Sequence, residues 1–592
     1  MVLLAVVALA AGAFAYYGKG RGWRAWVAHR YFGGPVPFAE RPAVTETRPA
    51  HYDGSVPLDA FVAADVMLPN DGYVVDAKSV RPDTVRLFRT ADKKEVPAVV
   101  NTSGGGDAIV LRPRDPLEPN TQYTFEVNAG VRDTAGAAFR YFTSSFTTAA
   151  AAQAVSLPVA FEKVALPAAD GEMFTSLAIG PDRRLYASTM DGRIVRYAVR
   201  PDGTLAEPFT ISSIQASGGG PRLVIGICFD PSSTADAPVL WVSHGQLVLK
   251  EATDWTGKIS RLSGPGLGTC QDYVVGLPRA VRDHLNNQPV VGPDGALYFC
   301  QASNTAMGAP DARWGMRPER KLTAAVLRFD PSKVTKPPLD ARTDEGGTYD
   351  PAAPGAPLTV YATGVRNAYD LAWHDNGKLY APLNASAAGG NTPAPSTAGP
   401  SGSTRVVPAL SDVRRTLEDY LVRVEPGSYH GHPNPLRGQF VLNGGNPSPA
   451  PDPAETPEYP VGVAPESAWR PPVYSFGKNL APTGVIAYRN ADAFGGLLRG
   501  KLLVCRYSGG DDILVLSVGD GGEVTEAVSG IDGFTRLMDP LDLVEDPESG
   551  NLYVAEFQPK RLTLLRPKVG AVSARVFRQS NAPADAPHAS TR

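Results

Sequence analysis

The sequence contains little cysteine. Among its 592 residues there are four, with no CxxC pair and no CxxCH motif: Cys228, Cys270, Cys300 and Cys505. The missing motifs exclude a c-type haem attachment and argue against a structural zinc site. Three of the cysteines stand in apolar, strand-like runs, so we expect buried free thiols instead of a disulfide framework.

Excess charge of either sign is also lacking. The chain carries 57 Lys and Arg against 60 Asp and Glu, for a net charge of −3. No basic footprint exists, so no nucleic-acid partner is expected. Glycine and proline, in contrast, are abundant at 60 and 55 residues, well above their usual combined share of about 12%. Together with 43% hydrophobic residues, this composition predicts a globular, turn-rich, all-β protein.

The chain begins with an apolar segment. Residues 2–17 carry no charge, but the run is shorter than the roughly 20 residues that span a membrane. The small-x-small triplet at 13–15 suits signal-peptide cleavage, whereas basic residues that only follow the run favour an uncleaved anchor. We expect residues 1–17 to be a signal peptide or a membrane anchor, with a linker over 18–51. The protein is then extracytoplasmic, in the periplasm, at the cell envelope or secreted.

A first β-domain is predicted over residues 52–148. Short strands with alternating apolar residues, such as Thr84–Phe88 and Gln122–Val127, are separated by turn signals, which indicates a β-sandwich. The segment resembles the bacterial Ig-like domain first described in S-layer proteins, in its P-D-T-V, P-N-T-x-Y-T and G-V-x-D-x-A-G motifs and its terminal F-T-T. The resemblance implies a spacer.

An internal repeat dominates residues 155–570. The motif G-P-D-x-x-L-Y occurs at 180–186 and 292–298, with related copies at 374–380 and 546–553. Each copy reads as a β-hairpin with a tight Asp/Gly turn. Regular hairpins need packed neighbours, which predicts a β-propeller with six blades of about 60–70 residues. Residues 571–592 are expected to form a disordered tail.

Two dipeptides precede predicted hairpins and carry candidate chemistry. A histidine beside a carboxylate, His284 next to Asp283, can hold a defined tautomer and act as a general base. An arginine beside an amide, Arg366 next to Asn367, can bind and orient a carboxylate ligand.

Longer motifs around these dipeptides resemble the glucose/sorbosone dehydrogenase family. They read D-H-L-N-N-Q-P-V-V-G-P-D-G-A-L-Y at 283–298, G-V-R-N-A-Y-D-L-A-W at 364–373 and G-S-Y-H-G-H-P at 427–433. The resemblance implies a propeller that holds the quinone cofactor PQQ and Ca²⁺, with His284 as the base. It also implies cofactor contacts from Arg366, Asn367, Arg506 and Arg536. Calcium ligands in this family are mostly backbone carbonyls and waters, so no side chain is assigned to the metal.

The chain departs from the family pattern at several positions. The family's glutamine before the early strand is Pro221 or Arg222 here, and the aspartate that supports the base aligns with Ser303 or its neighbour Asn304. Met538 replaces the second of two late arginines. The family's lysine is also replaced, so Arg506 is the cation nearest to that position.

Three functions remain open. The first is an exported dehydrogenase that oxidises a sugar or polyol and passes electrons to a separate acceptor. The second is a non-catalytic propeller that binds a protein or glycan at the cell envelope. The third is a calcium-dependent hydrolase or lactonase, which would need carboxylates and amides to converge on the propeller axis.

Overall fold

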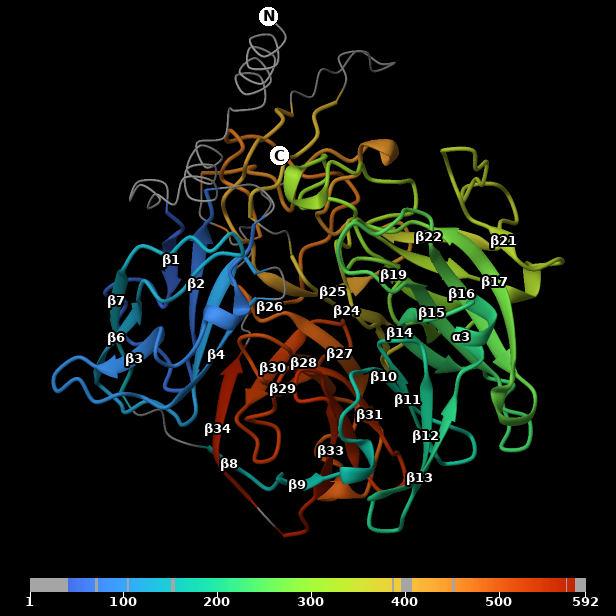
Figure 1. Cartoon of the computed structure of the whole chain (residues 1–592), viewed down its shortest axis with the longest axis horizontal. Helices are drawn as coiled ribbons and strands as arrows, with labels where there is room; N and C mark the ends of the chain where they lie inside the picture. Colours follow the sequence, from blue (N-terminus) through green and yellow to red (C-terminus); the bar gives the residue numbers. More distant parts are fainter. Residues whose placement is uncertain are drawn as a thin grey trace, which may run out of the picture. The chain divides into compact units, whose positions relative to one another are not determined.

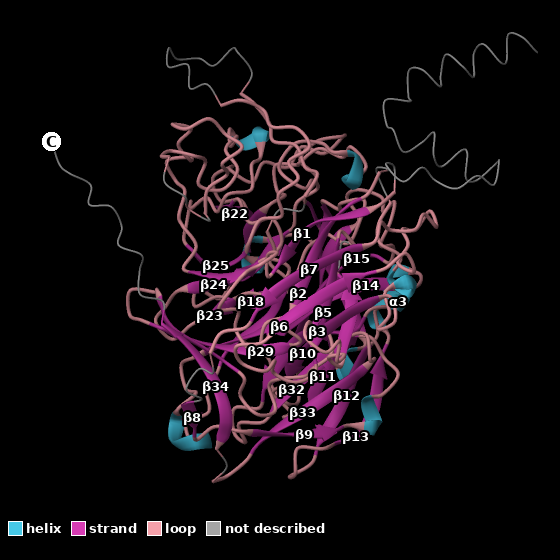
Figure 2. Ribbon diagram, turned by 90° about the vertical axis from the view of Figure 1, so that its left-hand side faces the viewer, coloured by secondary structure: helices cyan, strands magenta, loops and turns pink. Residues whose placement is uncertain are grey.

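The computed structural model describes residues 41–69, 73–103, 106–150, 155–385, 388–395, 407–449, 452, 454–570 and 572–580. The chain divides into two compact units, Met1–Gln153 and Ala154–Arg592. The all-β prediction is confirmed: the one α-helix among the described residues, α3 (Ser213–Gly218), is short, and strands dominate the ribbon in Figure 2. All four cysteines are free; Cys300 and Cys505 are buried, whereas Cys228 and Cys270 are half-buried.

The first unit contains two antiparallel sheets. One has the order β1 (Ala43–Arg48), β2 (Val62–Met67), β5 (Ala108–Pro113) and β4 (Ala98–Thr102); the other has β3 (Val85–Arg89), β6 (Gln122–Val127) and β7 (Phe142–Thr147). Alternate residues of both sheets, among them Val62, Ile109 and Phe125, share one buried core. Two sheets with inward-facing apolar residues form the predicted sandwich.

The first sheet begins earlier than the sequence indicated. Strand β1 lies inside the predicted linker 18–51, yet it pairs with β2 in the antiparallel sense. The guanidinium of Arg48 also donates two hydrogen bonds to Asp65, at 2.8 and 2.6 Å. The predicted segment 1–17 lies outside the described residues. Among the residues that are described, no helix is long and apolar enough to cross a membrane.

The second unit is built from six sheets, which we number in chain order (Figure 1). Sheets 1 to 3 contain β10 (Phe174–Ile179), β11 (Leu185–Thr189), β12 (Ile194–Val199) and β13 (Leu205–Ile211); β14 (Arg222–Phe229), β15 (Leu240–Gln246), β16 (Gly257–Ser263), β17 (Thr269–Leu277) and β21 (Leu339–Asp340); and β18 (Val290–Val291), β19 (Leu297–Gln301), β20 (Ala325–Phe329) and β22 (Leu358–Thr363).

Sheets 4 to 6 continue the series. They contain β23 (Ala372–Trp373), β24 (Leu379–Leu383), β25 (Asp419–Val424) and β26 (Tyr474–Gly477); β27 (Pro482–Ala487), β28 (Leu502–Arg506), β29 (Asp512–Val518), β30 (Val524–Ser529), β34 (Ser573–Ser580) and β8 (Val155–Leu157); and β31 (Pro540–Glu545), β32 (Leu552–Glu556), β33 (Arg561–Pro567) and β9 (Phe161–Ala165).

The two ends of this unit are joined by strand pairing. Strand β9, near the start of the unit, pairs with β33, near its end, and completes sheet 6. Strand β34 pairs with β30 on one side and with β8 on the other. The segment 571–592 is therefore not a disordered tail throughout, because residues 573–580 form a strand; residues 581–592 lie outside the described part.

The first strands of successive sheets are linked by side chains. Asp542 on β31 accepts a hydrogen bond from the Leu177 backbone N–H of β10 at 2.7 Å. Ser176 on β10 accepts one from the Ile227 N–H of β14 at 3.1 Å. Sheet 6 therefore contacts sheet 1, and sheet 1 contacts sheet 2.

The repeated G-P-D-x-x-L-Y motif has a local physical cause. The tyrosine hydroxyl returns to the turn aspartate, from Tyr186 to Asp182 and from Tyr298 to Asp294, each at 3.0 Å. The ring packs on the first glycine of the motif, so a Cβ at Gly292 would lie 2.3 Å from Tyr298. The motif thus specifies a hairpin closed by its own aromatic residue.

Candidate functional site

The candidate base, His284, lies in the loop between β17 and β18. Its side chain is 4% exposed, and its Nδ1 lies 2.9 Å from the carbonyl oxygen of Ser303. Because a carbonyl only accepts, Nδ1 carries the proton and Nε2 of the neutral ring keeps a lone pair. Burial, helped by the positive charge of Arg366, holds the pKa of His284 well below its ordinary value. The ring is therefore neutral near pH 7, as a general base requires.

The indole of Trp314 brings this histidine together with the candidate arginine. Its ring centroid lies 4.3 Å from that of His284, and the guanidinium of Arg366 lies 5.3 Å from the same indole. Trp314 ends a 3₁₀ turn (Ala312–Trp314) that is capped by Asp311, whose side chain accepts from the Trp314 N–H. One buried indole thus contacts both the neutral imidazole and the cation.

Backbone contacts fix the arginine loop to the same group. The Arg366 carbonyl accepts a hydrogen bond from the Ser303 N–H at 2.8 Å, and its guanidinium donates to the Ala385 carbonyl at 2.9 Å. Asn367 Oδ1 accepts from Asn287 Nδ2 at 2.7 Å. Arg366 and Asn367 therefore join His284, as the sequence motifs implied.

Asp283 does not take the place expected for it. Its side chain is exposed, and its charge acts on the pKa of Arg279 and of Tyr507. The Nδ1 atom of His284, which a supporting carboxylate would bind, is bound by the backbone of Ser303 instead. The tautomer is therefore fixed by a carbonyl that no residue type in the sequence reveals.

The contacts of Arg506 and Arg536 lie elsewhere. Arg506, on β28, donates to both carboxylate oxygens of Asp512, at 2.7 and 2.5 Å. Arg536 is exposed, and its carbonyl accepts from Lys163 at 2.8 Å. Met538, at the position of the family's second arginine, is 43% exposed.

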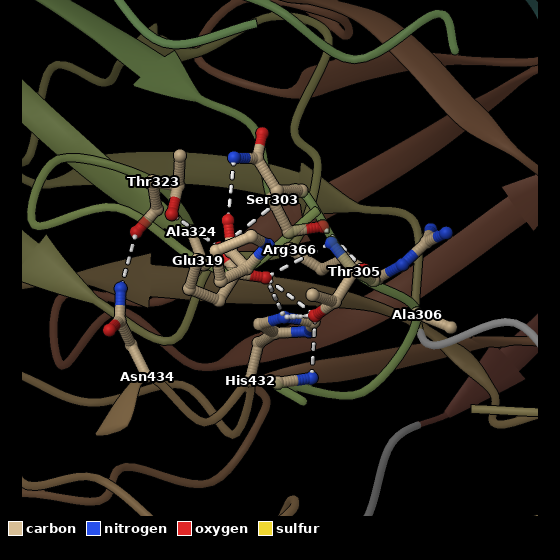
Figure 3. Close-up of polar contacts among 12 residues, drawn as sticks. Ser303, Thr305, Ala306, Glu319, Thr323, Ala324, Arg366, His432 and Asn434 are labelled. Atoms are coloured by element: carbon tan, nitrogen blue, oxygen red, sulfur yellow. Dashed lines mark hydrogen bonds and ion pairs between the residues drawn. The ribbon is translucent and has the colours of Figure 1, made fainter. Parts of the chain in front are cut away.

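A buried hydrogen-bonded cluster around Glu319 and His432 was missed by the sequence analysis (Figure 3). The Glu319 carboxylate lies 3.1 Å from His432 Nε2. It also accepts hydrogen bonds from the Asn304 N–H (3.2 Å), from the Thr305 N–H (3.1 Å) and hydroxyl (2.6 Å), and from the Thr323 hydroxyl. Burial alone would raise the pKa of Glu319, but His432 and these hydroxyls hold it below its usual value.

Glu319 is linked to the candidate base, His284, by the backbone of residues 303–305. The residues whose N–H groups it binds, Asn304 and Thr305, directly follow Ser303, and Ser303 holds the imidazole of His284. No local pattern reveals this arrangement, because Glu319 and His432 are 113 residues apart.

A pocket in the second unit is lined by none of His284, Arg366 and Asn367. It has a volume of about 410 Å³ and is lined in part by Met190 and Leu247. Both side chains pack against a small apolar cluster that contains Leu285, the residue after His284. No group of three or more His, Cys, Asp or Glu side chains suited to a metal ion occurs within the described residues.

Comparisons with known proteins identify the first unit directly. Residues 39–148 match the bacterial Ig-like domain family, which confirms the prediction for this segment. None of the curated proteins matches the chain.

Solved structures resemble the larger part of the chain. A putative oxidoreductase (glucose dehydrogenase) from Thermus thermophilus is 20% identical, with a TM-score of 0.41, and the match covers 69% of this chain and 99% of that one. The PQQ-bound aldose sugar dehydrogenase of Streptomyces coelicolor is 16% identical, with a TM-score of 0.42 and coverage of 70% and 99%. The PQQ domain of pyranose dehydrogenase from Coprinopsis cinerea is 12% identical, with a TM-score of 0.46 and coverage of 70% and 98%. These are enzymes of the kind that the sequence motifs resemble, but at such scores the likeness establishes no activity for this chain.

Proposed function

We propose that the chain is an exported oxidoreductase that oxidises a hydroxyl of a sugar or polyol, using PQQ and Ca²⁺ in a six-bladed β-propeller. The six sheets of the second unit would be its blades, with β9 closing the ring through sheet 6. The observation that carries the proposal is the bond from His284 Nδ1 to the Ser303 carbonyl, which leaves Nε2 as a base.

Each residue of the site has a separate role in the proposed reaction. His284 takes the hydroxyl proton at Nε2, and its lowered pKa keeps the ring neutral near pH 7. A bound PQQ would supply the hydride acceptor. Trp314 holds the imidazole and the arginine on its ring.

The residues present fit PQQ in part. PQQ carries three carboxylates, and Arg366 with Asn367 provides a cation and an amide beside the base. Arg506 is bound to Asp512, so it would have to exchange that partner to reach a ligand. Calcium would be held by backbone carbonyls and waters, as hard oxygen ligands suit it, and no side chain is assigned to it.

The residues near the end of the propeller, where the family has cofactor-binding cations, favour a second function. The pairing of Arg506 with Asp512, together with exposed Met538 where a second arginine was expected, reduces the positive charge available to a tricarboxylate. A propeller that recognises a protein or glycan without catalysis needs no such charge. Export and attachment through residues 1–17 are part of both proposals.

Titration of PQQ into the purified full chain by calorimetry, with calcium present, distinguishes the two. We expect micromolar or tighter binding that Arg366→Ala abolishes, while Arg414→Ala, which removes an exposed arginine paired with Asp412, leaves binding unchanged. A redox dye then reports oxidation of sugars. Absence of both binding heat and thermal stabilisation by PQQ would rule out the dehydrogenase and leave the recognition function.

A further inference from the structure

Three buried oxygen-bearing side chains from different sheets meet in the second unit. Asp370 stands just before β23 of sheet 4, Asp542 lies on β31 of sheet 6, and Gln288 precedes β18 of sheet 3. Their exposed fractions are 4%, 0% and 9%. The Gln288 N–H donates to the carbonyl of Tyr369, next to Asp370, at 3.2 Å, and its side-chain amide, acting as a donor, lowers the pKa of both carboxyl groups. The three side chains therefore form one group, which we call the axial cluster.

Sheets 1, 2 and 5 also contact Asp370 or its neighbour Tyr369. Tyr369, next to Asp370, donates its hydroxyl hydrogen to the Thr175 carbonyl of sheet 1 at 2.6 Å, and the hydroxyl lies 3.4 Å from the Ile225 carbonyl of sheet 2. Val485 of sheet 5 donates its N–H to Asp370 at 3.0 Å. The axial cluster is thus the point on which all six sheets converge.

Two oxygens of the cluster have no hydrogen-bond partner within the described part of the chain. They are Oδ1 of Asp542 and Oε1 of Gln288. A buried polar atom without a partner is costly, and native proteins rarely leave one unexplained. Gln288 Oε1, and Asp542 Oδ1 when the carboxyl is ionised, are acceptors only, so a cation satisfies them as a hydrogen-bond donor would.

The backbone is shaped to admit these side chains. A Cβ on Gly484 would lie 2.8 Å from Asp542 Oδ1, and a Cβ on Gly226 would lie 2.3 Å from the Gln288 Cα. The strand pairs that carry these residues are irregular, with register shifts in β14, β27 and β31. Bulges of this kind re-aim side chains and backbone groups, often beside sites.

The charges of the cluster call for compensation. Burial raises the pKa of Asp370 to about 7. Burial and then the charge of Asp370 raise the pKa of Asp542. Two carboxylates this close are both ionised at neutral pH only with a positive charge between them. Within the described residues neither carboxyl is acted on by an arginine or lysine, so the compensation is a bound cation or a shared proton.

We propose that the axial cluster is a structural calcium site, with Asp370, Asp542 and Gln288 as side-chain ligands. Calcium takes six to eight oxygen ligands and accepts carboxylate, amide and backbone carbonyl together. This site is separate from any calcium that accompanies a cofactor beside His284, and it does not depend on the chain being a dehydrogenase. The role of the ion is structural: it would stabilise the packing of the six sheets around the axial cluster.

The test is the calcium content and calcium response of the purified full chain without PQQ. After chelation and desalting, calcium is added back and measured by elemental analysis, and thermal unfolding is followed with and without it. We expect wild type to hold about one equivalent more calcium than Asp542→Asn and to gain several degrees in Tm on calcium addition, a gain that the variant lacks. Sodium and magnesium serve as competing ions.

Asp419→Asn is the matched control. Asp419 is equally buried, but it accepts from the Ala385, Leu480 and Ala481 N–H groups, so the variant should keep the calcium response. If Asp542→Asn fails to fold, Gln288→Leu removes one neutral ligand oxygen and should weaken calcium binding at least tenfold. Equal calcium content and an equal response in wild type, Asp542→Asn and Gln288→Leu would overturn the proposal and favour a proton shared by the two carboxyls.

Discussion

The imidazole of His284 is oriented by a backbone atom: its Nδ1 donates to the Ser303 carbonyl at 2.9 Å. A carbonyl cannot lose or gain a proton in the working pH range, so the tautomer is fixed independently of pH. In many general-base sites a carboxylate performs this task, and its charge raises the basicity of the ring. Here the ring is held without that charge.

Replacing His284 by Asn should separate catalysis from binding. If Nε2 is the base, dye-linked oxidation should fall by about 10²–10⁴-fold, while PQQ affinity measured by calorimetry changes little because Arg366 is untouched. An unchanged thermal unfolding curve checks that the variant is folded. Full activity in this variant would show that another group takes the proton.

Asp283→Asn should have almost no effect. The carboxylate is exposed and the ring nitrogen that it was expected to bind is already occupied by Ser303, so kcat/KM should stay within about twofold, a change below 0.5 kcal/mol. Steady-state kinetics at pH 7 measures this. A tenfold or larger fall would show that Asp283 supports the base after all.

Glu319→Ala should destabilise the second unit strongly. The change leaves His432 and two buried N–H groups without their acceptor, and each buried donor left unsatisfied costs about 1–3 kcal/mol. Denaturant unfolding measures the loss. Exposed Glu523→Ala is the control and should change stability by less than about 0.5 kcal/mol.

Glu319 also predicts an acid-sensitive stability. Its pKa is lower in the folded chain than in the unfolded chain, so its contribution is complete above the unfolded value and is lost as pH falls through the folded one. The milder variant Glu319→Gln, compared with wild type below pH 5, should therefore show a smaller loss on acidification. Parallel curves for the two proteins would contradict this.

His430 should add to the loss of stability in acid. Burial lowers its pKa to about 4, against about 6.5 unfolded. Between these values the unfolded chain binds the proton more tightly, so the contribution is full above pH 6.5 and falls by about 3 kcal/mol by pH 4. The free energy of unfolding at pH 7 and pH 4.5, in wild type and His430→Asn, measures it. We expect the difference between the two proteins to shrink at the lower pH.

Local signals in the sequence predicted most of the fold. The turn aspartate, first glycine and closing tyrosine of each G-P-D-x-x-L-Y hairpin lie within seven residues, so their pattern is visible along the chain. The candidate site is different. His284 and Arg366 were identified from extended motifs, but the bonds that hold them come from Ser303 and Glu319, and the Glu319 pair spans 113 residues. A backbone carbonyl and a lone glutamate leave no signature in residue type.

Strand β34 is another element that residue types in the sequence did not predict. Residues 573–580 read as a polar end of the chain, yet they pair with β30 through backbone groups. Backbone hydrogen bonds do not depend on side-chain type, so a strand can form in a sequence with little apolar content.

The pairing of β9 with β33 has a consequence for synthesis. About 400 residues separate the two strands. Arg566 of β33 contacts Glu162 of β9, and these two residues are 404 positions apart in the sequence. During translation β9 leaves the ribosome early and presents an uncovered edge until β33 follows it. At roughly 5–20 residues per second, that interval lasts on the order of 20–80 s, during which the exposed edge can pair with a neighbouring chain unless it is covered.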